Sequence, residues 1–91
     1  MSTRPEVYEA LDGERAYQDT RWNSDTTSSG GLHSFEEWFT YMEDYIAEAK
    51  HVLSRHVKKD ADFVASHIMR KVTAMGVAAM EQLGAPKRDG F

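Results

Sequence analysis

The segment from Val72 to Met80 constrains the fold of this chain more than any other feature. Every residue in it except Thr73 is apolar or glycine. A helix that is apolar on all sides must be buried on all sides. One neighbouring helix cannot cover that circumference, so we expect at least two helices to pack against this segment. The second of them comes either from the N-terminal part of the same chain or from another copy of the protein.

The chain has 91 residues and no cysteine. This length is enough for one small helical domain, which we expect to span residues 1–91. A domain of this size buries about 60–65% of the surface that its unfolded chain exposes, so its core is marginal. Without cysteine, no disulfide can reinforce that core. Together with the apolar segment, these limits predict a homo-oligomer.

Charge is distributed unevenly along the chain. Residues 1–48 carry 3 Lys or Arg against 11 Asp or Glu, whereas residues 49–91 carry 8 against 4. Such halves suit a chain that folds back on itself, or subunits that pair head to tail. The overall net charge of −4 argues against nucleic acid as a partner.

Membrane insertion and secretion are not expected from the sequence. No apolar run reaches the roughly 20 residues of a membrane span, and the N-terminus lacks the apolar core of a signal peptide. We therefore expect a soluble, cytoplasmic protein without a membrane partner.

A capping box marks the start of a central helix. Ser34 and Glu37 have the spacing at which each side chain accepts a hydrogen bond from the other residue's backbone N–H. Apolar residues then recur in two neighbouring rows, one at alternating steps of three and four and one at steps of seven: Phe35, Trp38, Met42, Tyr45, Ala49 and Val52, and Phe39, Ile46 and Leu53. These rows predict an amphipathic helix over residues 34–55, wide enough to face more than one neighbour.

Two further helices complete the predicted fold. Pro5 suits the first turn of an N-terminal helix over residues 5–22. A C-terminal helix over residues 60–83 would end at Gly84, in a left-handed conformation, before Pro86. The predicted class is all-α: a long antiparallel two-helix hairpin plus a shorter N-terminal helix, assembled as a homo-oligomeric helical bundle.

The remaining segments are predicted to lack regular structure. Residues 23–33 are rich in glycine, serine and threonine, which cannot anchor a loop to a core, so we expect them to form a flexible loop. Residues 84–91 form a short tail after the last helix.

A dense polar and aromatic cluster between Glu14 and Trp22 is the main candidate for function. Aromatic rings can stack on a base, guanidinium groups can bind phosphate, and an amide or carboxylate can bind base edges or ribose hydroxyls. Two later basic residues lie inside the most apolar helix. The candidate ligand-binding residues are Arg15, Gln18, Asp19, Arg21, Trp22, His33, Arg70 and Lys71.

A purely structural role for the same residues is the alternative. Tyr17 and Trp22 would then belong to the core. Arg70 and Lys71 would form ion pairs with acids of the second helix such as Glu43 or Asp44, or would bind an anion.

Metal binding and nucleophilic catalysis find little support. Glu43, Asp44 and Glu48 are carboxylates on the second helix, but the third helix offers no acid between Asp62 and Glu81. Because Mg²⁺ needs oxygens converging from at least two elements, we expect no metal site and no cofactor. Cysteine is absent, and no serine lies in a nucleophile elbow.

The order of several motifs resembles a group of small phage-encoded helical proteins, and more distantly the MazG-type all-α nucleoside triphosphate pyrophosphohydrolases. The motifs are Glu14-Arg15-x-x-Gln18-Asp19-x-x-Trp22, His33, Trp38, Glu43-Asp44, Ala49, Ala74, Val77-Ala78-Ala79-x-Glu81 and Arg88. MazG-type enzymes hold Mg²⁺ with paired acids on two successive helices. Here Ala47 replaces an acid of the first pair, and Arg70 and Lys71 lie where the second pair would be. The resemblance therefore implies a relative without the metal site.

These observations lead to one leading hypothesis and two alternatives. The leading one is a non-enzymatic phage accessory protein, acting in counter-defence by binding and sequestering a nucleotide-derived small molecule. One alternative is a divergent MazG-like pyrophosphohydrolase that uses Glu43, Asp44 and Glu48 with Mg²⁺. The other is an acidic inhibitor of a host protein.

Overall fold

The computed structural model describes residues 1–23 and 30–90. In these residues it contains three α-helices and no strand: α1 (Arg4–Arg21), α2 (Phe35–Arg55) and α3 (Lys58–Leu83). The predicted all-helical class is thus confirmed. No helix in this part of the chain is both long and apolar enough to cross a membrane.

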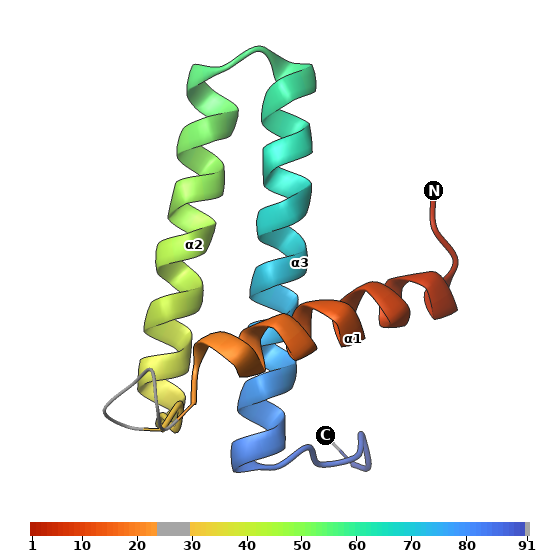
Figure 1. Ribbon diagram of the computed structural model, residues 1–91, viewed down its shortest axis with the longest axis vertical. Coiled ribbons are helices and arrows are strands. Elements are labelled where there is room, and N and C mark those ends of the chain that lie inside the picture. The colour runs from red at the N-terminus through yellow and green to blue at the C-terminus, as the bar shows by residue number, and fades with distance from the viewer. Residues whose placement is uncertain (24–29, 91) are drawn as a thin grey trace.

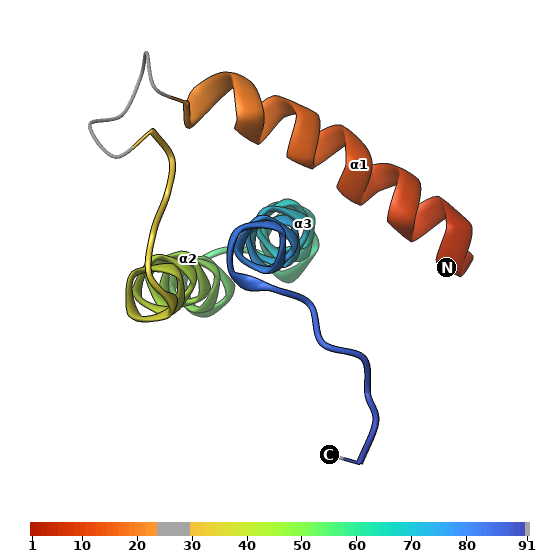
Figure 2. The same cartoon turned by 90° about the horizontal axis from the view of Figure 1, so that it is seen from below.

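Helix α3 is the central element of the fold. It lies beside α2, to which it is joined by the short connection at His56 and Val57, so the chain reverses direction between them (Figure 1). Helix α1 crosses α3 on one side of this pair, and the view along the α2–α3 pair shows it on that side only (Figure 2). The packed pairs are α2 with α3 and α1 with α3.

Capping explains where two of the helices begin. At α2, the Glu37 N–H donates to Ser34 Oγ at 3.2 Å and the Ser34 N–H donates to Glu37 Oε1 at 3.0 Å, which is the predicted capping box. Thr3 and Glu6 form a second box at α1, which the sequence analysis did not identify although Thr-x-x-Glu has the required spacing. Backbone N–H donation lowers the pKa of both glutamates.

The helix boundaries differ slightly from those predicted. The predicted N-terminal helix over 5–22 runs from Arg4 to Arg21, and the one over 34–55 starts at Phe35. Helix α3 begins at Lys58 rather than at residue 60; it has no side-chain cap. An ion pair between Lys58 and Asp62, at 3.1 Å, lies on this first turn instead.

The end of α3 partly matches the prediction. Gly84 has a positive φ of 112°, as expected after a helix, but its ψ of 150° lies outside the left-handed helical region. Its N–H still donates to the Met80 carbonyl at 2.9 Å.

The core lies where α2 and α3 meet near their N-terminal and C-terminal ends, respectively. Trp38 is 2% exposed and packs with buried residues of α3, and the partly buried side chains of Trp22, Met42 and Tyr45 surround this cluster. The buried residues of the apolar segment are Val72, Ala74, Met75, Ala78 and Ala79.

Cover for the apolar segment comes from within the chain. Helices α1 and α2 both pack on α3, which is the alternative in which the N-terminal helix folds back. Met80, at the end of the segment, remains 48% exposed. The burial of Val72 to Met80 therefore does not by itself require a second copy, and the predicted homo-oligomer stays a prediction.

Part of the predicted flexible loop, residues 24–29, lies outside the described residues. Gly31, which follows it, is buried and packs on the backbone of Trp22. Its φ is 82°, and a Cβ at this position would lie 2.4 Å from the Trp22 carbonyl oxygen. Only glycine fits there without displacement of the backbone.

Candidate functional site

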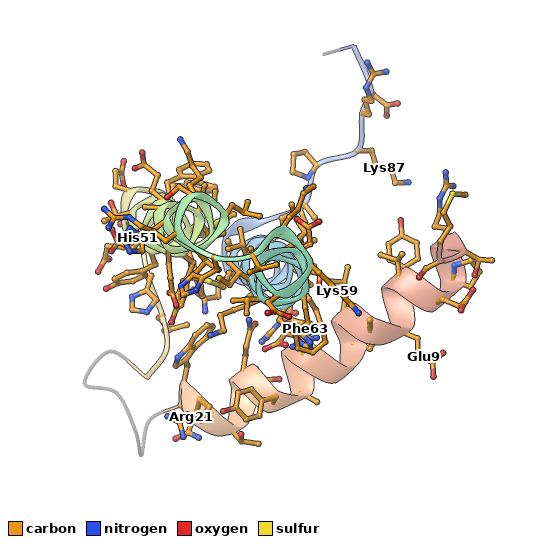
Figure 3. The ribbon with its side chains drawn as sticks, turned by 90° about the horizontal axis from the view of Figure 1, so that it is seen from above. Glu9, Arg21, His51, Lys59, Phe63 and Lys87 are labelled. Carbon is orange, nitrogen blue, oxygen red and sulfur yellow. The ribbon has the colours of Figure 1, made fainter. Side chains whose placement is uncertain are left out.

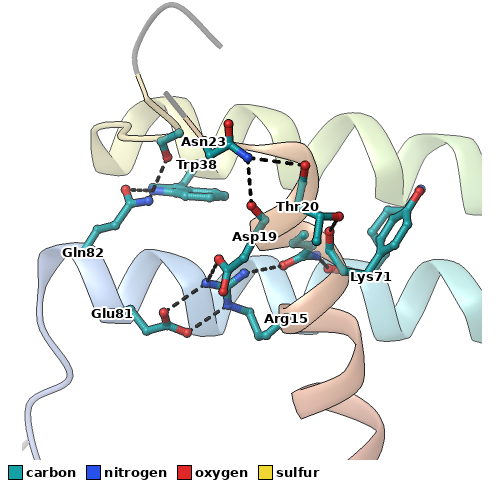
Figure 4. A network of polar contacts seen from close by, with 11 residues as sticks. Arg15, Asp19, Thr20, Asn23, Trp38, Lys71, Glu81 and Gln82 are labelled. Carbon is teal, nitrogen blue, oxygen red and sulfur yellow. Dashed lines mark hydrogen bonds and ion pairs between the residues drawn. The ribbon is translucent and has the colours of Figure 1, made fainter. Parts of the chain in front are cut away.

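Arg15 is the centre of a polar network between α1 and α3 (Figure 4). Its Nε and Nη2 donate to the two carboxylate oxygens of Glu81 at 2.8 and 3.0 Å. Nη2 also donates to Asp19 at 2.8 Å, and Nη1 donates to the Gln18 side chain at 3.3 Å. The hydrogen bond to Glu81 raises the pKa of Arg15 and lowers that of Glu81. Most of the donor capacity of the guanidinium is therefore used inside the chain.

Gln18 and Lys71 also serve the contact between α1 and α3. Gln18 is 2% exposed, and its Nε2 donates to the backbone carbonyl of Lys71 at 3.2 Å. The ammonium group of Lys71 lies 4.6 Å from the ring centroid of Tyr45, which places it in cation–π contact with α2. Within the described residues Lys71 forms no ion pair with an acid of α2. The predicted ion pair of Lys71 with Glu43 or Asp44 is therefore wrong.

Arg70 pairs with α1 rather than with α2. Its Nε donates to Glu14 Oε1 at 2.6 Å, and the Glu14 side chain is 7% exposed. Its Nη1 lies 2.8 Å from His67 Nδ1, which must accept because an arginine N–H can only donate. The expected partners Glu43 and Asp44 are therefore replaced by Glu14, because α1 crosses this side of α3.

Gln82 holds together the residues around Trp38. Its Oε1 accepts hydrogen bonds from Trp38 Nε1 and from the His33 N–H, both at 3.1 Å. Its Nε2 donates to the Gly31 carbonyl at 2.8 Å. One amide of α3 thus fixes the segment that leads into α2, and the sequence analysis did not identify it.

Trp22 and His33 pack against Trp38 from two sides. The ring centroids of Trp22 and Trp38 are 6.1 Å apart in an edge-on arrangement, and those of His33 and Trp38 are 5.1 Å apart. His33 Nδ1 lies 3.6 Å from Glu37 Oε2, close enough for an electrostatic contact but too long for a hydrogen bond. Both predicted ligand residues are therefore part of the aromatic packing.

The predicted binding residues do not form one site. Arg15, Gln18 and Asp19 lie together on α1, Trp22 and His33 lie around Trp38, and Arg21 is exposed. The residues that complete these contacts and were not predicted are Glu14, Glu81 and Gln82. Glu14, Arg15, Gln18 and Glu81 belong to the motifs that carry the resemblance, and these four residues take part in the packing of α1 on α3.

A groove lies between the N-terminal half of α1 and α3. Its volume is about 300 Å³. Val7, Ala10 and Leu11 line it from α1, and Met69, Arg70 and Thr73 line it from α3. Of the predicted ligand-binding residues, Arg70 is the one that borders this groove.

The acids of α2 lie on its exposed surface. Glu43, Asp44 and Glu48 are all exposed. Among residues 1–23 and 30–90, no three His, Asp or Glu side chains lie close enough together to hold a metal ion. The geometry gives no specific support to a hydrolytic site on α2.

Comparison of the chain with protein-family models, with curated proteins and with solved structures finds no significant match. What the structure shows is the fold: residues 1–23 and 30–90 form three helices, and a polar interface joins α1 to α3.

Proposed function

We propose that this protein is a non-enzymatic binding protein that sequesters a small nucleotide-derived anion in the groove between α1 and α3. The observation that carries this proposal is that a groove of about 300 Å³ has a guanidinium group at its side. Its lining combines the apolar side chains of α1 and Met69 with polar residues, among them the carboxylate of Glu6 at the end away from the C-terminal half of α1. Ligand pockets usually begin at about this volume. The groove has room for one ring-bearing group with its phosphate outside.

Arg70 is held ready for an anion by its own partners. Glu14 engages Nε and His67 engages Nη1, which fixes the plane of the guanidinium. In the described part of the chain, the two N–H groups of Nη2 meet no acceptor. A phosphate oxygen at Nη2 would receive charge-assisted hydrogen bonds without displacing Glu14.

The apolar lining suits the other half of such a ligand. Val7 is 45% exposed and Met69 is 67% exposed, although both are apolar. A base or another flat ring placed between them would remove this surface from water. The resemblance to small phage-encoded helical proteins favours a counter-defence role, in which the bound ligand is withheld from a host receptor.

Calorimetric titration with cyclic dinucleotides and ADP-ribose derivatives tests this proposal. Arg70→Lys keeps a positive charge near Glu14 but loses the planar guanidinium group with its paired N–H donors. The affinity for the ligand should therefore fall about tenfold to a hundredfold. Ala10→Trp should block the groove without touching the polar network. Ala16→Trp, on an exposed position of α1 outside the groove, is the matched control.

Two outcomes would contradict the proposal. One is the absence of binding to any ligand of the panel by a folded wild-type protein. The other is equal binding by wild type, Arg70→Lys and Ala10→Trp, because the ligand would then sit elsewhere.

A further inference from the structure

An apolar stripe runs along α2 beside the side that faces α3. Its members alternate in steps of four and three, the spacing of a coiled-coil seam: Phe35, Phe39, Met42, Ile46, Ala49 and Leu53. Phe35 and Phe39 stack with their ring centroids 6.5 Å apart. Phe35, Phe39, Ile46 and Leu53 are open to solvent, from 45% exposed at Leu53 to 62% exposed at Phe39, whereas Met42 and Ala49 are partly buried. Four large apolar side chains exposed along one helix are unusual for a monomer and mark an interaction surface.

A second row on α3 continues this surface. Gly76, Met80 and Leu83 follow each other at steps of four and three, and Met80 is 48% exposed. The two rows meet where a Cβ on Gly76 would lie 3.8 Å from Met42 Cε. We call the combined surface the α2–α3 face; its exposed members are Phe35, Phe39, Ile46, Leu53, Met80 and Leu83.

Helix α1 does not cover the α2–α3 face. It packs on α3 through Arg70, Lys71 and Glu81, which on a helical wheel lie about 110° or more from the mean direction of the row of Gly76, Met80 and Leu83. Met69 and Thr73, one to two turns earlier on that side of α3, line the groove beside α1, so the open part of the row begins at Gly76. Phe63, on the same side of α3 as Arg70, points toward α1 in the view from above (Figure 3). Figure 2 likewise shows α1 on one side of the α2–α3 pair.

The charges along the α2–α3 pair indicate what covers this face. From Ser34 to Asp44 the chain carries four acids and no Lys or Arg, whereas from Lys50 to Asp62 it carries four Lys or Arg against two Asp. The four acids and the four bases are exposed. A second copy that lies antiparallel on the face would place the basic end of each subunit beside the acidic end of the other. A parallel copy would bring like charges together.

The size of the face agrees with a stable dimer. A helix of 21 residues, the length of α2, is about 31 Å long and about 10 Å wide with its side chains, and two packed helices lie about 10 Å apart, so the pair is about 20 Å wide. The pair therefore presents on the order of 600 Å² in projection, which side-chain relief brings near the roughly 800 Å² that each partner buries in a typical stable complex.

We propose that two copies of this chain associate through their α2–α3 faces in antiparallel orientation, forming a four-helix layer with each α1 on the outside. Packing at alternating steps of three and four would bury Phe39 and Ile46 against the partner. This proposal is independent of the ligand groove, because none of the six exposed members of the α2–α3 face lines that groove.

Sedimentation equilibrium of the full chain tests the interface. At micromolar concentration the wild-type mass should be close to twice the 10.4 kDa of one chain. Phe39→Asp should give a monomer with unchanged helical circular dichroism, because this side chain is already 62% exposed within one chain. Phe63→Asp is the matched control: Phe63 is 66% exposed on α3, away from the face, and its variant should remain a dimer. Ile46→Glu is a second variant on the face, should Phe39→Asp lose helicity.

Salt dependence tests the orientation. Raising sodium chloride from about 0.02 M to about 0.5 M should weaken an antiparallel dimer several-fold, because it screens the attraction between opposite ends. Strengthening by salt would overturn the antiparallel arrangement. A wild-type monomer at roughly 0.1 mM, or an equal loss of dimer in Phe39→Asp and Phe63→Asp, would overturn the interface itself.

Discussion

The guanidinium group of Arg15 receives acceptors from two helices at once. Glu81 of α3 takes two of its N–H groups, and Asp19 and Gln18 of α1 take others. The Arg15 side chain is 13% exposed, so its charge would be costly without these partners. A lysine could not replace it, because an ammonium cannot bind a carboxylate through two parallel N–H bonds. At the scale of the residue, this pair fixes α1 on α3.

Acid should weaken the Arg15–Glu81 contact, and Glu81→Gln should remove that effect. The hydrogen bond from Arg15 lowers the pKa of Glu81 in the folded chain, so the folded state binds fewer protons than the unfolded state. The stabilisation is complete above the ordinary glutamate pKa of about 4.3 and is lost as pH falls through the lower folded value.

Urea denaturation at neutral pH and at roughly pH 3 measures this change. Wild type should lose more stability in acid than Glu81→Gln does. Glu36→Gln, at an exposed position of α2, serves as the control and should follow wild type. An identical acid response of wild type and Glu81→Gln would show that the ion pair contributes nothing.

At the scale of the element, Gly13 within α1 and Gly31 before α2 have opposite roles. Gly13 lies inside α1 with nothing within 4 Å of a Cβ built on it, so it only raises the entropy cost of forming the helix. Gly31 has a φ of 82° and contacts the Trp22 backbone, and its carbonyl accepts from Gln82. Together with His33, whose N–H donates to the same Gln82 side chain, it attaches the segment before α2 to α3.

Alanine at these two positions should change stability in opposite directions. Gly13→Ala should stabilise the chain by about 0.5–1 kcal/mol through higher helix propensity. Gly31→Ala should destabilise it by about 1–3 kcal/mol, because the new Cβ meets the Trp22 carbonyl and the backbone conformation is unfavourable. Thermal melts of both variants beside wild type measure this, and a neutral Gly31→Ala would show that the segment shifts to make room.

The helices themselves could be predicted from the sequence because their signals are local. The Ser34–Glu37 box and the apolar rows fixed α2 to within one residue of its observed start. The start of α3 was missed by two residues, since Val57 has no side-chain cap and the position follows from the turn after α2. The Thr3–Glu6 capping box also has a local signal, the Thr-x-x-Glu spacing, although it was not predicted.

The candidate site was harder to predict because the inner face of α1 is polar. Glu14 and Gln18 are its buried residues, whereas Val7 and Tyr17 are about half exposed. A polar face on an isolated helix looks the same whether it binds a ligand or another helix. Only the crossing of α1 over α3, which no periodicity encodes, shows that Arg15 and Gln18 bind α3.

At the scale of the whole molecule, Trp38 is where the parts of the chain meet. Its ring contacts Trp22 at the end of α1 and His33 before α2, and its N–H donates to Gln82 of α3. It is 2% exposed and one of the largest fully buried side chains. A domain of 91 residues has a free energy of unfolding on the order of 5–14 kcal/mol, so one such residue carries a large share of the total.

Replacing Trp38 in two steps should separate its hydrogen bond from its volume. Trp38→Phe keeps a ring but leaves the Gln82 oxygen with one donor fewer, and we expect a loss of about 1–2 kcal/mol. Trp38→Ala also opens a cavity beside Met75 and should cost about 3–5 kcal/mol, enough to broaden or abolish the cooperative transition of so small a domain.

Tyr17→Ala, at a ring that is 57% exposed, is the control and should stay within about 0.5 kcal/mol of wild type. Urea denaturation followed by circular dichroism measures all three, and a Trp38→Ala protein that unfolds cooperatively within about 1 kcal/mol of wild type would show that the helices hold together without this contact.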